Sequence, residues 1–66
     1  MSIVKIIEVI AKSNKSFDDA VNNAVIEAAK SVKNIKSVYV KEMKAKVENN
    51  KIDTYRVTTK ISFVKE

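Results

Sequence analysis

The sequence contains no cysteine, histidine, tryptophan, glycine or proline. Without cysteine and histidine, the chain has no disulfides, no thiolate or imidazole metal ligands, and no catalytic base or nucleophile of either type. Without glycine, it has no phosphate-cradling loop of the Walker or Rossmann kind. Ser37 also has no histidine to activate it as a nucleophile. These absences predict that the protein is not an enzyme.

The chain of 66 residues predicts one domain, spanning 1–66, because no repeat, linker or low-complexity segment divides it. A domain this small buries too little surface to be comfortably stable without disulfides, metals or oligomerisation. With disulfides and the common metal sites excluded, oligomerisation is the remaining aid. The hydrophobic fraction of 45% agrees with apolar surface buried between subunits.

The net charge of +5 makes nucleic acid or an anionic ligand a partner to consider. The lysines are spread along the chain with acids between them, whereas binding to a nucleic-acid backbone favours a continuous basic stripe. Solvated surface lysines are therefore the preferred interpretation. A basic nucleic-acid-binding module stays an alternative.

The sequence has no apolar run near the roughly 20 residues that cross a bilayer. Residues 1–5 lack the basic region and the cleavage site of a signal peptide. These features predict a cytoplasmic protein with no membrane partner.

Residues 51–65 alternate apolar and polar side chains, which is typical of a strand with one buried face. The expected buried face holds Tyr55, Val57, Ile61 and Phe63, and the opposite face holds Thr54, Arg56, Thr58, Lys60 and Ser62. Residues 3–10 are rich in β-branched side chains and predict a strand buried on both faces over part of its length.

A helix is predicted from Ser16 to near Asn34. Ser16 is the expected N-cap, and Asp19 is placed to reach back to it as in a capping box. The expected apolar stripe holds Phe17, Val21, Ala24, Ala28 and Val32. Asp18 and Asp19 are interpreted as capping residues at the positive end of the helix dipole rather than as metal ligands. Ile26 falls on the polar face, either exposed or in a subunit contact.

Residues 37–47 predict the second strand along the chain, followed by a hairpin turn over 48–51 that leads into the third, residues 51–65. One face is expected to hold Tyr39, Met43, Ala45 and Val47, and the other Val38, Val40, Glu42 and Lys44. A three-residue loop would pair Met43 with Val57 and Ala45 with Tyr55, whereas a two-residue loop would pair Glu42 with Val57. Burial favours the first register, and a bulge would alter the remainder.

The order strand, helix, strand, strand predicts an α+β fold. A right-handed crossover between the first two strands leaves a gap that the third fills, giving a three-stranded antiparallel sheet of order 1-3-2, partly wrapped around one helix. The other face of the sheet, with Thr54, Arg56 and Thr58, is expected to meet water or another subunit.

Glu8 and Glu42 lie within strands of apolar residues, where a charged group needs a partner. One interpretation is an ion pair with a lysine or with Arg56. The other is that the two carboxylates are ligands of a hard cation.

Several runs occur in a fixed order along the chain: Lys5-Ile6-Ile7-Glu8, SNKSFDDAV over 13–21, Asn22-Asn23-Ala24, VENNK over 47–51, Tyr55-Arg56-Val57 and Ile61-Ser62-Phe63. This ordered set resembles the dodecin family from about Lys5 to the C-terminus. The resemblance implies a strand-helix-strand-strand subunit, a homo-oligomeric hollow shell of 12 copies, and, in many members, flavin storage.

Two positions depart from the flavin-binding members. A tryptophan that stacks on the flavin ring is replaced by Ser37, and a glutamine that pairs with the edge of the ring is replaced by Arg56. Losing the ring removes a stacking contact worth on the order of 1 to 3 kcal/mol. Arginine also only donates hydrogen bonds, whereas glutamine donates and accepts. A third departure is Ala11-Lys12, where the family usually has Gly-Thr.

The tryptophan-lacking branch of the family, sometimes called calcium dodecins, has the same two changes, and this sequence resembles that branch more closely. The leading hypothesis is therefore a non-enzymatic, dodecin-like oligomer that binds or stores a small molecule or an ion. Calcium is one candidate ligand, and ordinary flavin binding is not expected. Flavin storage with another stacking group is an alternative.

Overall fold

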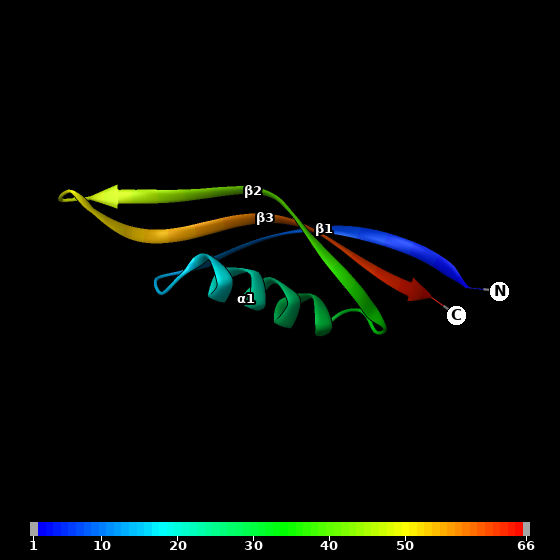
Figure 1. Cartoon of the computed structure of the whole chain (residues 1–66). Helices are drawn as coiled ribbons and strands as arrows, with labels where there is room; N and C mark the ends of the chain where they lie inside the picture. Colours follow the sequence, from blue (N-terminus) through cyan, green and yellow to red (C-terminus); the bar gives the residue numbers. More distant parts are fainter. Residues whose placement is uncertain (1, 66) are drawn as a thin grey trace.

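The computed structural model describes residues 2–65. The elements are β1 (Ile3–Ser13), α1 (Phe17–Ala29), β2 (Ile35–Glu48) and β3 (Lys51–Lys65). They form one sheet of order β1-β3-β2, in which β3 is antiparallel to both neighbours (Figure 1). The predicted element order, strand order and strand directions are confirmed.

The core lies between α1 and one face of the sheet. Ala20, Ala24 and Ala28 are buried on the helix, and the small side chains of Ala24 and Ala28 allow close approach to Ile61 of β3. The predicted buried face of β3 is confirmed, and the buried Thr59 shares it, its hydroxyl donating to the Val9 carbonyl oxygen at 2.8 Å.

Ser13 joins the end of β1 to the start of α1. Ser16 Oγ accepts from the Asp19 amide at 3.0 Å, which confirms the predicted N-cap. Asp19, however, accepts from Ser13 Oγ at 2.6 Å, and Ser13 Oγ accepts from the amides of Lys15 and Ser16 at 2.9 and 3.5 Å. The predicted direct capping box is therefore replaced by one that runs through the Ser13 hydroxyl.

The helix ends at Ala29, earlier than the predicted end near Asn34. The amides of Ser31 and Val32 both donate to the Ala28 carbonyl oxygen, which closes the last turn. Asn34 then has a positive φ of 61°, a conformation that ends a right-handed helix and that asparagine tolerates better than most residues. Val32 lies outside the helix but still packs on the core. Its position at helical spacing therefore made the apolar stripe, and the predicted helix, extend beyond Ala29.

The β2–β3 turn consists of Asn49 and Asn50, with φ angles of 52° and 63°. Two consecutive positive φ angles suit the right-handed twist of a hairpin, and asparagine supplies them in a chain without glycine. The two-residue turn corrects the predicted three-residue loop.

The preferred register is nevertheless confirmed, since Met43 lies opposite Val57 and Ala45 opposite Tyr55. A register shift after Lys46 explains both results. The extra residue that it adds to β3 moves the pairing by one position, as a longer loop would have done.

A second register shift, between Val40 and Glu42, corrects the predicted faces of β2. Val40 lies opposite Thr59 and Glu42 opposite Thr58, so Lys41 is the extra residue. Side chains before Lys41 consequently exchange faces relative to those after it. Val38 packs toward the core, while Tyr39, opposite Lys60, lies on the side of the sheet away from α1.

The Ser13 network makes a testable contribution to stability. Replacing Ser13 by alanine leaves the Asp19 carboxylate and two amides without their partner, so we expect the free energy of unfolding to fall by about 2 kcal/mol. Ser31→Ala, at an exposed position just after the helix, should change it by less than about 0.5 kcal/mol. Chemical denaturation followed by circular dichroism measures both, and equal effects would contradict the role of Ser13.

Candidate functional site

The side of the sheet away from α1 is called the open face. Cross-strand pairing and strand alternation place the following residues on it: Val4, Ile6, Glu8, Ile10 and Lys12 of β1; Thr54, Arg56, Thr58, Lys60 and Ser62 of β3; and Ser37, Tyr39, Glu42, Lys44 and Lys46 of β2. Every candidate site residue from the sequence lies on this face.

Ser37 and Arg56, the predicted cofactor-contact positions, lie far apart within one subunit. Ser37 Oγ is 2.5 Å from Ser62 Oγ, whereas Arg56 lies opposite Lys12 and Lys44. Six residues of extended β3 separate Ser62 from Arg56, which is about 20 Å. A small ligand that touches both positions would have to take them from two copies of the chain.

Glu8 and Glu42, the predicted metal ligands, lie in neighbouring cross-strand rows, opposite Lys60 and Thr58 respectively. Glu8 forms an ion pair with Lys41, at 3.8 Å between Oε2 and Nζ. Both side chains are about half exposed, so this pair contributes little to stability. The ion pair agrees with the first interpretation of Glu8.

Calcium requires more oxygen ligands than this pair of residues supplies. It takes six to eight oxygens, of which two carboxylates provide at most four. Within residues 2–65, no three acidic side chains gather where they could hold a metal. One subunit therefore does not fit a calcium ion, and a site at Glu8 and Glu42 would need ligands from another copy.

A basic pocket near the hairpin end of the open face was missed by the sequence analysis. It is a hollow of about 360 Å³ lined by Lys12, Lys44, Ala45, Lys46, Thr54 and Arg56. Arg56 is half-buried and the three lysines are exposed. The preferred hairpin register already placed Lys44 beside Arg56, but only the β1–β3 pairing adds Lys12.

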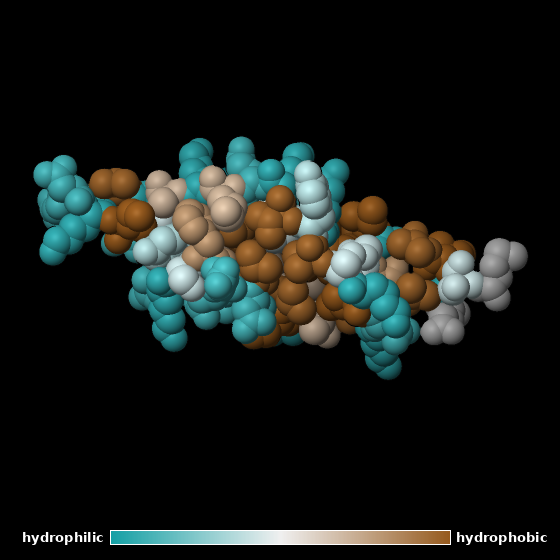
Figure 2. All heavy atoms as spheres, in the orientation of Figure 1, coloured by the Kyte–Doolittle hydropathy of each residue, from teal (hydrophilic) through white to brown (hydrophobic). Residues whose placement is uncertain are grey.

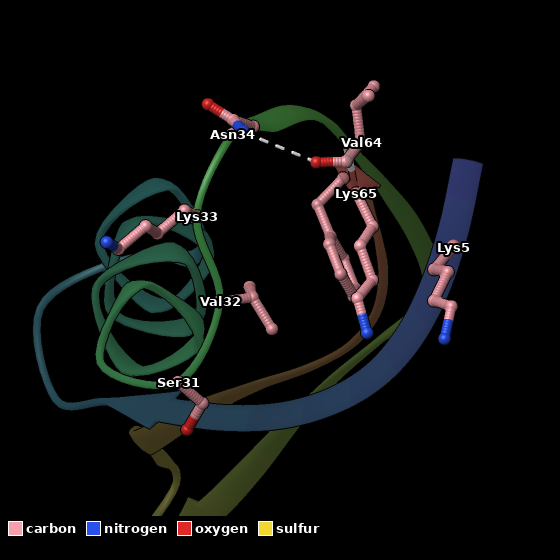
Figure 3. Close-up of a pocket in the computed structure, with 8 residues that line it drawn as sticks. Lys5, Ser31, Val32, Lys33, Asn34, Val64 and Lys65 are labelled. Atoms are coloured by element: carbon pink, nitrogen blue, oxygen red, sulfur yellow. Dashed lines mark hydrogen bonds between the residues drawn. The ribbon is translucent and has the colours of Figure 1, made fainter. Parts of the chain in front are cut away.

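A second hollow, of about 420 Å³, lies between the end of α1 and the strands (Figure 3). The Asn34 side chain donates to the Val64 carbonyl oxygen at 3.4 Å at its edge. Figure 3 shows Val32 pointing into this space and Lys33 pointing away from it. Lys33 therefore contributes no charge to the interior of this hollow.

Hydrophobic side chains remain exposed along the molecule. Figure 2 shows them from the hairpin end to the end where β1 begins. On the open face, Val4, Ile6 and Ile10 are 67%, 63% and 54% exposed. β1 is thus covered on one face within a single chain, and the predicted burial of its second face requires another molecule. Ile26 is also exposed, at 54%.

Within the part of the chain that the structure describes, α1 is neither long nor apolar enough to cross a membrane.

Comparisons with known proteins give one family. The dodecin family model matches residues 3–66. The calcium dodecin of Mycobacterium tuberculosis, described as a calcium-chelating immunodominant antigen with a novel calcium-binding site, is 35% identical with a TM-score of 0.80, over 92% of this chain and 87% of that one. No curated protein matches the sequence.

Two further solved structures have the same fold. The dodecin from Streptomyces coelicolor is 25% identical with a TM-score of 0.91, over 98% of this chain and 93% of that one. A variant of the Thermus thermophilus dodecin is 21% identical with a TM-score of 0.93, over 100% of this chain and 98% of that one. Because the family model matches nearly the whole chain and the calcium dodecin is 35% identical over most of it, this chain belongs to the dodecin family.

Proposed function

We propose that the protein is a non-enzymatic, homo-oligomeric shell of 12 copies that binds a small molecule or an ion at its subunit junctions and lacks ordinary flavin binding. The observation that carries this proposal is the exposed apolar open face of β1. Val4, Ile6 and Ile10 form an apolar set on a sheet that α1 covers on the other side.

The dimensions of the single chain support assembly. Its accessible surface is 5027 Å², whereas a compact monomer of this length exposes about 4,200 Å². Its radius of gyration is 13.5 Å, against about 11 Å for a compact domain of the same size. The excess surface and the elongated shape are those of a subunit that completes its packing with other copies.

The case against ordinary flavin binding rests on Ser37 and Arg56. The Ser37 hydroxyl contacts Ser62 and offers no ring for stacking. Arg56 lies among lysines, where a guanidinium with only donor groups replaces a side chain that donates and accepts.

A second candidate function is flavin storage with a different stacking residue. The register shift at Lys41 turns Tyr39 onto the open face, where it is 65% exposed. Its ring is the aromatic group on that face among residues 2–65 and could stack on a flat ligand.

Assembly through the open face is tested by Ile6→Lys. A charge placed in a buried apolar contact is costly, so we expect native mass spectrometry to show 12 copies for the natural protein and mainly smaller species for Ile6→Lys. Asn14→Lys adds the same charge at an exposed position in the connection before α1 and should leave 12 copies. A monomer or dimer in the natural protein would contradict the shell.

Flavin binding is tested by fluorescence quenching. We expect the natural protein not to quench added riboflavin, and the double variant Ser37→Trp/Arg56→Gln to quench it, because the change restores a stacking ring and an amide. Quenching by the natural protein that is lost in Tyr39→Ala would instead support the second candidate function.

Calcium binding is tested by calorimetry on the assembled protein. If Glu8 and Glu42 of neighbouring copies hold the ion, Glu8→Gln and Glu42→Gln should each weaken binding about tenfold, because each removes a charged oxygen ligand. Glu27→Gln, on the exposed surface of α1, is the matched control. Equal affinities in all four proteins would remove both residues from the site.

A further inference from the structure

A row of three positive side chains crosses the open face. Lys12 of β1 and Lys44 of β2 lie on either side of Arg56, directly opposite it in the two strand pairings. Neighbouring strands are about 4.8 Å apart, so the three residues start within about 10 Å of one another. Like charges directly opposite in a sheet are destabilising, so a negatively charged group beside this row would be stabilising.

The described part of the subunit supplies little compensation. Within residues 2–65, no carboxylate lies within ion-pair distance of Lys12, Lys44 or Arg56. Lys46, in the next row, contacts Glu48 at 4.0 Å, and both of these side chains are largely exposed. Four positive groups therefore share one pocket with a single weak partner.

The pocket has the form of an anion site. Its volume of about 360 Å³ is sufficient for a small polar ligand, and the lining side chains come from all three strands. Arg56 is half-buried at its centre, and a guanidinium presents a planar set of donors that matches phosphate oxygens. The Thr54 hydroxyl donates to Asp53 at 2.9 Å, so the cations, not this hydroxyl, would hold the ligand.

We propose that the pocket formed by Lys12, Lys44, Lys46 and Arg56 binds a phosphate-class oxyanion, either inorganic phosphate or the phosphoryl group of a small molecule. This inference rests on the proposed binding function and names the chemical class of one ligand. A charged guanidinium and three ammonium groups bind a dianion through charge-assisted hydrogen bonds, which also removes the repulsion within the row. The pocket is too local for the continuous stripe that a nucleic-acid backbone favours.

Calorimetric titration of the assembled protein tests the inference, at constant ionic strength in chloride. Inorganic phosphate and glycerol 3-phosphate serve as probes, and the tighter of the two identifies the source of the phosphoryl group. We expect saturable binding that weakens about tenfold in Arg56→Gln and in Lys44→Gln. Lys36→Gln, an exposed lysine on β2 outside the pocket, should bind as the natural protein does.

Thermal unfolding in chloride alone provides a second readout. Relief of repulsion predicts that Lys44→Gln unfolds at the same or a higher temperature than the natural protein and loses the upward shift that phosphate produces. A lower unfolding temperature and a smaller assembly in Lys44→Gln would show that the row instead pairs with carboxylates of another copy, and would overturn the inference.

Three other results would also overturn it: no phosphate binding, equal weakening in Lys36→Gln, or binding of duplex DNA without binding of either probe. Native mass spectrometry of each sample separates the inference from the shell. A 12-copy protein that does not bind phosphate removes only the anion site, whereas a monomer that binds phosphate removes only the shell.

Discussion

One helix can cover only one face of a three-stranded sheet, and the structure follows from this constraint. Alanines on α1 allow close packing against β3, so the core is compact but small. The open face keeps exposed apolar residues on β1 beside charged residues on β2 and β3. Hydrophobic burial favours covering the first group, whereas the second group needs partners of opposite charge wherever that covering buries it. The proposed assembly and the proposed ligand binding therefore concern the same surface.

The sequence predicted the fold well because its signals were local. Alternation in β3, the Ser16 cap and the two asparagines of the turn each depend on a few neighbouring residues. For the part of β2 before Lys41, side chains were assigned to the wrong faces of the sheet. An extra residue in a strand reverses the alternation without leaving a clear pattern in the sequence. The direct capping box failed for a similar reason, since its Ser13 partner lies outside the usual spacing.

The candidate site was less predictable because it depends on pairing between distant strands. The sequence identified Glu8 and Glu42 as charges in apolar strands. It did not reveal that Lys41 would be the lysine that contacts Glu8. The basic pocket was missed because Lys12, Lys44 and Arg56 look like scattered lysines and one arginine until β1 and β2 are both aligned on β3. Acidic and basic groups consequently occupy neighbouring rows of one face, which neither composition nor net charge reveals.

We propose that the open face is an interface between copies rather than a surface in contact with water. A crystal structure of the natural protein grown without added metal tests it most directly. We expect a closed assembly of 12 copies in which Ile6 and Ile10 are buried against neighbouring subunits. Separate chains whose open faces line solvent channels, with Ile6 and Ile10 still exposed, would contradict it.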